Sequence, residues 1–94
     1  MITRLVKMNF HPDKVKTFQE IFETNKKLIA SFPGCSSLQL KRDINQPTIF
    51  FTISEWNSEA DLENYRKSEL FQNVWSKTKV LFSEKAQAWT VQSA

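Results

Sequence analysis

Histidine and cysteine, which often serve in acid–base, nucleophilic and metal chemistry near neutral pH, are rare in this sequence. The 94 residues include one histidine, His11, and one cysteine, Cys35. A histidine without a positioned partner is a poor general base, and a thiol is a poor nucleophile unless its pKa is depressed. Neither residue has such a partner near it in sequence. We therefore expect both to lie outside the chemistry of the protein, and we expect no metal site.

Composition excludes several further classes of function. The only glycine, Gly34, cannot build a phosphate-binding loop or a dinucleotide fingerprint, and a single cysteine allows no internal disulfide. No uninterrupted apolar run exceeds three residues, so we expect no membrane span or secretory segment, and a cytoplasmic location. The net charge is +3, but basic and acidic residues alternate along the chain. This mixture does not favour nucleic-acid binding.

The hydropathy pattern predicts four strands and two helical regions, the second of them in two segments, that would position any site. Alternating residues predict strands over 2–10, 36–43, 48–56 and 86–92, and helical spacing predicts a helix over 13–32. Ser58 and Ser68 are expected to cap two consecutive helical segments, the second continuing its apolar stripe to Leu81 and Phe82. The order β-α-β-β-α-β predicts one α+β domain over residues 1–94. It is a ferredoxin-like four-stranded antiparallel sheet with its helices on one face.

The strand predicted over 48–56 is apolar on both faces. Ile49, Phe51 and Ile53 alternate with a second set of side chains: Phe50, Thr52, Ser54 and Trp56. Helices can cover only one face of a sheet, and an exposed apolar patch usually marks an interface. We therefore expect a homodimer that forms through the sheet face opposite the helices.

The helix-covered face is expected to enclose a small cavity. Thr52 and Ser54 are small, and Asn25 falls within the apolar arc of the long helix, where an amide needs a partner. The cavity would hold a small aromatic ligand between aromatic side chains. The expected lining is Phe18, Phe22, Trp56, Tyr65, Phe71 and Trp75, with Asn25 and Tyr65 as polar anchors. The same residues also fit a filled aromatic core with an internally bonded Asn25, and the pattern leaves this alternative open.

Three segments of the chain together resemble the antibiotic biosynthesis monooxygenase (ABM) domain. They are Phe32–Cys35, Phe51–Glu59 and Leu62–Phe71, which include a Pro-Gly turn and a Glu-Trp-x-Ser stretch. The resemblance implies a ferredoxin-like fold that assembles as a dimeric α/β barrel. Members of this family oxidise aromatic polyketides or quinols with molecular oxygen and no metal or flavin, degrade heme, or act on small signalling molecules.

The resemblance carries over only in part at the level of single residues. Trp56 matches the tryptophan of the quinone-forming members, but their asparagine falls on Thr52 and their tyrosine on Leu62. Tyr65 takes the place of a histidine in the quinol-oxidising type. The heme-degrading members have a tryptophan at that place and a histidine after it, which this chain lacks, so heme degradation is not expected.

The resemblance therefore implies a cofactor-independent monooxygenase for a small aromatic or quinol-type substrate. The expected catalytic residues are Trp56, Tyr65 and Asn25. The expected substrate-binding residues are Phe18, Phe22, Thr52, Ser54, Phe71 and Trp75. An electron-rich phenol would reduce oxygen directly in a dry slot, with Asn25 or Tyr65 stabilising the oxyanion. The alternative is a non-catalytic module that binds a small molecule.

Overall fold

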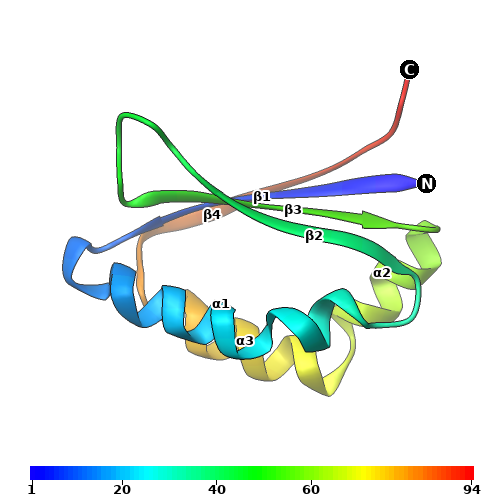
Figure 1. The fold of residues 1–94 in the computed structure, drawn as a ribbon, viewed down its shortest axis with the longest axis horizontal. Coiled ribbons are helices and arrows are strands. Elements are labelled where there is room, and N and C mark those ends of the chain that lie inside the picture. The colour runs from blue at the N-terminus through cyan, green and yellow to red at the C-terminus, as the bar shows by residue number, and fades with distance from the viewer.

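The structure, a computed structural model, describes residues 1–94 as two layers (Figure 1). The strands are β1 (Ile2–Phe10), β2 (Cys35–Arg42), β3 (Ile49–Trp56) and β4 (Phe82–Val91). The helices are α1 (Val15–Ala30), α2 (Glu59–Arg66) and α3 (Glu69–Lys79), with a 3-10 turn, η1 (Pro12–Lys14), before α1. No helix is long and apolar enough to cross a membrane.

The four strands form one antiparallel sheet in the order β2-β3-β1-β4. Figure 1 shows all three helices beneath one face of this sheet, while no element covers the other face. This arrangement confirms the ferredoxin-like α+β fold predicted from the order of the elements.

Local signals in the sequence set the ends of the helices. The Oγ atoms of Ser58 and Ser68 accept hydrogen bonds from the backbone N–H groups of Asp61 and Phe71, so both predicted caps form. Gly34, between α1 and β2, has a φ of +92°. A Cβ atom at this position would also overlap the Asp61 side chain, so the turn requires glycine for two reasons.

The last strand begins four residues earlier than the sequence pattern predicts, at Phe82. Helix α3 ends at Lys79; of the two residues that seemed to continue its apolar stripe, Leu81 lies in the following turn and Phe82 begins the next strand. Phe82 pairs with Phe10 across the β1–β4 ladder and also packs against its ring, with 5.3 Å between the ring centroids. The helical spacing misled here because Leu81 and Phe82 are turned inward by the start of β4 rather than by a helix.

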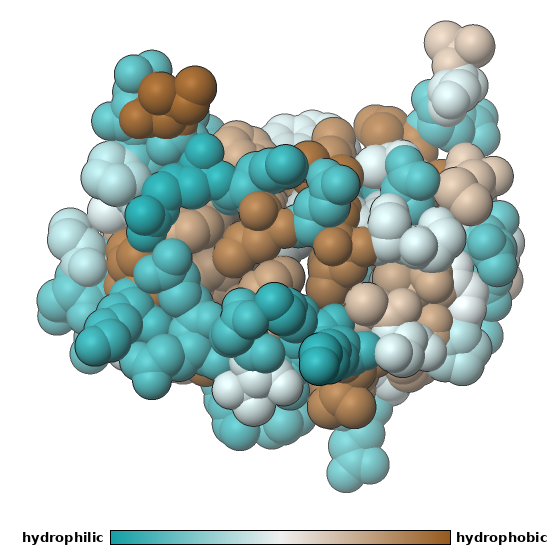
Figure 2. Space-filling model, viewed as in Figure 1, coloured by the Kyte–Doolittle hydropathy of each residue, from teal (hydrophilic) through white to brown (hydrophobic).

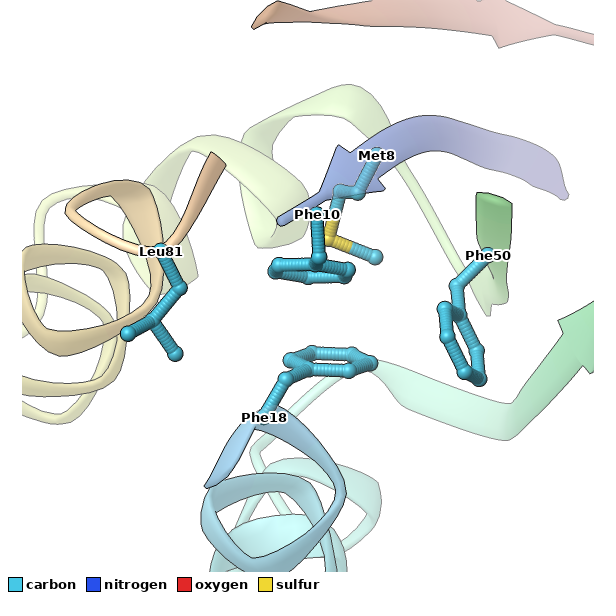
Figure 3. Packing of buried hydrophobic residues seen from close by; sticks show 5 residues of the cluster. All are labelled: Met8, Phe10, Phe18, Phe50 and Leu81. Carbon is cyan, nitrogen blue, oxygen red and sulfur yellow. The ribbon is translucent and has the colours of Figure 1, made fainter. Parts of the chain in front are cut away.

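Eight of the buried hydrophobic residues form two separate clusters on the helix side of the sheet. The first lies at the β1 C-terminal end, where the Phe10 and Phe18 rings stack with 4.2 Å between centroids and Phe50 meets both edge-on. Figure 3 shows this arrangement. The full cluster is Met8, Phe10, Phe18, Phe50 and Leu81. The second cluster, Ile2, Trp56 and Leu62, lies at the other end of β1.

The sheet face away from the helices carries apolar side chains at its centre. In the strand register, Leu5 of β1 lies between Ile53 of β3 and Trp89 of β4. Phe51 and Val91 occupy the neighbouring rows, and Trp89 and Val91 are 45% and 43% exposed. The apolar character expected of this face is therefore present.

Candidate functional site

A cavity of about 330 Å³ lies between the sheet and the helices. Its floor is formed by inward-facing strand residues: Arg4, Val6, Met8, Leu38, Thr52, Ser54, Ala86 and Ala88. Its roof comes from the three helices: Phe18, Phe22, Ile29, Leu62, Tyr65, Arg66, Phe71, Val74, Trp75 and Thr78. Figure 2 shows apolar side chains in the band between the two layers, above a largely hydrophilic helical surface.

The cavity exists because the floor is made of short side chains between the two buried clusters. Along β1, Arg4 and Val6 separate Ile2 of one cluster from Met8 of the other. Across the sheet, Thr52 lies opposite Val6, and Ala88 flanks Val6 on the other side. Threonine, serine and alanine cannot reach the helices, so the space above them stays open.

Seven of the nine residues expected at the site line this cavity. They are Phe18, Phe22, Thr52, Ser54, Tyr65, Phe71 and Trp75. The structure thus brings these side chains together around one space. Three of the aromatic side chains form a continuous row along its wall. Tyr65 meets Phe71 edge-on with 5.2 Å between centroids, and Phe71 stacks on Trp75 at 5.8 Å.

Trp56 does not line the cavity, contrary to the sequence expectation. Its side chain is fully buried, stacked on Tyr65 with 5.0 Å between ring centroids and packed edge-on against Phe32. The indole Nε1 donates a hydrogen bond of 2.9 Å to Ser54 Oγ. Trp56 therefore supports two residues of the cavity wall, Ser54 and Tyr65, from behind.

Asn25 also lies outside the cavity wall. Its Nδ2 donates a 2.8 Å hydrogen bond to the Ile21 carbonyl oxygen, one turn back in α1. A helical wheel places Asn25 among apolar residues, but it does not show that the amide can bond within its own helix. The partner of this partly buried amide is therefore the helix backbone.

Tyr65 presents a phenol that stays protonated at neutral pH. Burial, with a smaller effect of the neighbouring Cys35, raises its pKa to about 12. The hydroxyl makes no hydrogen bond within the chain, although Tyr65 lines the cavity. Tyr65 can therefore donate a hydrogen bond to a molecule in the cavity, but it is unsuited to act as a base.

The pKa of Tyr65 makes stability depend on pH in the alkaline range. A tyrosine in the unfolded chain loses its proton near pH 10, whereas folded Tyr65 keeps it up to about pH 12, so stability is lost between these values. We expect the stability advantage of the native chain over Tyr65→Phe to fall by about 1–1.5 kcal/mol from pH 9 to pH 11. Urea unfolding at both pH values measures it, and a constant difference would contradict a buried phenol.

Two arginines at the cavity were not identified from the sequence. Arg4 lies on the inward face of β1 between Ile2 and Val6, and Arg66 ends α2. The signal for Arg4 was present, because a charged residue at an inward position of an alternating strand is unusual. Apart from these two, the wall holds no charged side chain and no histidine. No three His, Cys, Asp or Glu residues gather anywhere in the molecule.

The sequence model of the antibiotic biosynthesis monooxygenase family matches residues 1–75, from β1 into α3. The chain belongs to this family. The match covers both predicted caps and most of the cavity wall, including the ABM segments that end at Phe71. No curated protein matches the sequence.

Solved structures share the ABM fold over the whole chain. One described as an antibiotic biosynthesis monooxygenase is 16% identical, with a TM-score of 0.93 over 100% of this chain and 99% of its own. A conserved protein from Methanosarcina mazei Go1 is 18% identical, with a TM-score of 0.93 over 100% and 94%. Rv0793 from Mycobacterium tuberculosis is 13% identical, with a TM-score of 0.91 over 99% and 94%. At these identities the likeness concerns the fold.

Proposed function

We propose that this protein is a cofactor-independent monooxygenase that oxidises a small aromatic or quinol-type substrate with molecular oxygen. The observation that carries the proposal is an aromatic cavity with hydroxyl donors in a member of the ABM family. A volume of about 330 Å³ is at the low end for ligand sites, which suits a molecule of one or two rings.

In this mechanism the substrate supplies the electrons. A phenol or enol that has lost its proton passes an electron to oxygen, and the two radicals combine at carbon. One oxygen atom remains on that carbon as a carbonyl, and the other leaves as water with the hydrogen of that carbon and the proton that the substrate hydroxyl lost. The aromatic walls exclude bulk water, and Tyr65 and Ser54 donate hydrogen bonds to the substrate oxyanion.

Trp56 acts indirectly in this proposal. The Ser54 oxygen accepts the hydrogen bond from the Trp56 indole, so the hydroxyl hydrogen is free to point into the cavity. Trp56 thereby orients Ser54, and its stacking on Tyr65 fixes that ring as well. Trp56 is a positioning residue rather than a contact of the substrate.

The cavity wall offers no carboxylate or imidazole to take the substrate proton. The proton would pass to water before the substrate enters, so the rate should follow the ionisation of the substrate itself. The pH at half-maximal rate should therefore move with the pKa of the phenol when substituted substrates are compared.

Oxygen uptake with dihydroxynaphthalenes tests the proposed reaction. We expect Tyr65→Phe to lower the rate about 100-fold, because it removes one donor to the oxyanion. Thr24→Val is the matched control: it also removes one hydroxyl, but from the exposed face of α1. Circular dichroism checks that both variants fold. An absence of uptake across a broad panel of quinols and phenols would contradict the proposal.

The second candidate is a binding module without turnover. The wall without a base favours it, as do Thr52 and Leu62 at places where the quinone-forming members have asparagine and tyrosine. Binding of a dihydroxynaphthalene, seen as a rise in melting temperature, without oxygen uptake would support this candidate over the monooxygenase.

We also propose that two copies pair through the uncovered sheet face. Leu5, Ile53 and Trp89 form one row across three strands, and Phe51 and Val91 extend it. An apolar surface of this kind on a single chain is costly to leave in water. Pairing would bury it and give the dimeric α/β barrel that the resemblance implies.

A further inference from the structure

Arg4 is placed on the floor of the cavity by the register of the sheet. It lies directly opposite Ser54 on β3 and Thr90 on β4, in one row of the helix-covered face. Paired residues of an antiparallel sheet lie on the same face, with Cβ atoms roughly 5 Å apart. Arg4 and Ser54 are therefore neighbours on the wall of one cavity.

The Arg4 guanidinium has no carboxylate partner. Its Nη1 donates a 2.9 Å hydrogen bond to Thr90 Oγ1, and neither ion pair in the structure includes it. Burial, and then the positive charge of Arg66, lowers the pKa of Arg4, while Glu63 opposes this shift. Arginine nevertheless stays charged at neutral pH, so a half-buried cation with free N–H donors faces the cavity.

Polar and apolar groups occupy different ends of the cavity. Ser54, Arg4, Tyr65 and Arg66 lie near the Trp56 end of the sheet, where α2 crosses it. Beyond them the floor and roof carry no charge and are apolar apart from the hydroxyls of Thr52 and Thr78; the apolar residues there include Val6, Met8, Ala88, Phe18, Phe22, Val74 and Trp75. A ligand that fills this space needs one polar, negatively charged end and one aromatic or aliphatic end.

We infer that the cavity takes an aromatic carboxylic acid, with the carboxylate on Arg4 and the ring toward Phe18 and Trp75. The inference rests on the proposed function and narrows its substrate to an acidic phenol or quinol. Guanidinium and carboxylate match in shape and bond through two parallel hydrogen bonds. Arg66 forms an ion pair with Glu63, with 3.3 Å between Nη1 and Oε2. Arg4 is therefore the arginine of the cavity that has no carboxylate partner.

At Arg4 this charge arrangement favours one carboxylate over other groups. A quinol without a carboxylate would leave the half-buried Arg4 without a counter-charge, which costs free energy when the ligand displaces water from the guanidinium. A phosphate ester brings nearly two negative charges and needs several donors, whereas the wall has one unshared guanidinium and no glycine-rich loop. A single carboxylate fits both the charge and the space.

Paired probes test the inference without any turnover. 1-Naphthoate and 1-naphthamide have the same rings and nearly the same shape, but only the first is an anion. We expect the native chain to bind 1-naphthoate about 10- to 100-fold more tightly than 1-naphthamide in anaerobic calorimetry. Equal affinities, or failure of both probes to bind, would overturn the inference.

Variants then assign the difference to Arg4. Arg4→Met keeps an unbranched apolar stem but removes the charge, and should abolish the preference for 1-naphthoate while leaving 1-naphthamide within about threefold. Arg4→Lys should retain part of the preference. Lys16→Met, an exposed site on α1, removes the same charge and should change neither affinity. A preference that persists in Arg4→Met would overturn the assignment.

The proposed function can fail while this inference holds. Tight, Arg4-dependent binding of 1-naphthoate supports the inference even if no hydroxylated naphthoate consumes oxygen. In that case only the monooxygenase proposal is contradicted. Oxygen uptake with neutral quinols, together with equal affinity for the two probes, gives the reverse outcome.

Discussion

Replacing Trp56 with alanine is expected to lower the free energy of unfolding by about 3–5 kcal/mol. Trp56 has no exposed surface and is the largest residue of its cluster, with Tyr65 on one side and Phe32 on another. The substitution leaves a large void and also removes the donor that holds Ser54 Oγ. Urea unfolding at a fixed protomer concentration measures the loss.

Trp56→Phe separates the packing of the Trp56 ring from its effect on the orientation of Ser54. This variant keeps an aromatic ring against Tyr65 but has no N–H for Ser54, and we expect it to lose about 1–2.5 kcal/mol. If the proposed function holds, its oxygen uptake should fall while its fold persists. A loss below about 1.5 kcal/mol in Trp56→Ala would contradict a central place for this side chain in the second cluster.

Replacing Ile53 with glutamate is expected to abolish the proposed dimer. Ile53 lies at the centre of the uncovered face, beside Leu5, so the carboxylate would be buried without a partner when two sheets pack together. Sedimentation velocity at micromolar concentration should find twice the 11.0 kDa mass for the native chain and a single chain for Ile53→Glu.

Ile44→Glu is the matched control for this experiment. It makes the same chemical change, but Ile44 lies in the β2–β3 loop and is 97% exposed. It should remain a dimer. A native chain that sediments as a folded monomer at micromolar concentration would contradict the pairing proposal, whatever the variants do.

The open floor of the cavity could be predicted because it depends on strand alternation alone. Once residues 48–56 were assigned to a strand, Thr52 and Ser54 had to share a face with Phe50 and Trp56. Their small size then predicted unfilled space beneath the helices, and the cavity lies above them. Because side chains alternate strictly between the two faces of a strand, the pattern supports such an inference.

The positions of Trp56 and Asn25 could not be predicted in the same way. Alternation gives the direction of Trp56 but not whether Phe32 and Tyr65 will enclose it. Helical spacing places Asn25 near the apolar arc but cannot show its bond to the Ile21 carbonyl. Both depend on side-chain packing between elements far apart in sequence, or on a choice of rotamer.

The position of Arg4, in contrast, could be predicted from the sequence. Its strand was predicted correctly, and alternation from Ile2 to Val6 places Arg4 on the helix side. A cation at such a position has to find either a partner or a polar cavity.

The division of the interior into two clusters has a consequence for how the molecule melts. Met8 and Phe18 bound the space on one side and Leu62 on the other, and a row of contacting rings, Tyr65, Phe71, Trp75 and Phe82, links the two clusters along one wall. A ligand bound in the cavity would contact both clusters and so couple their unfolding more tightly. Saturation would thus sharpen the calorimetric transition as well as raise its midpoint.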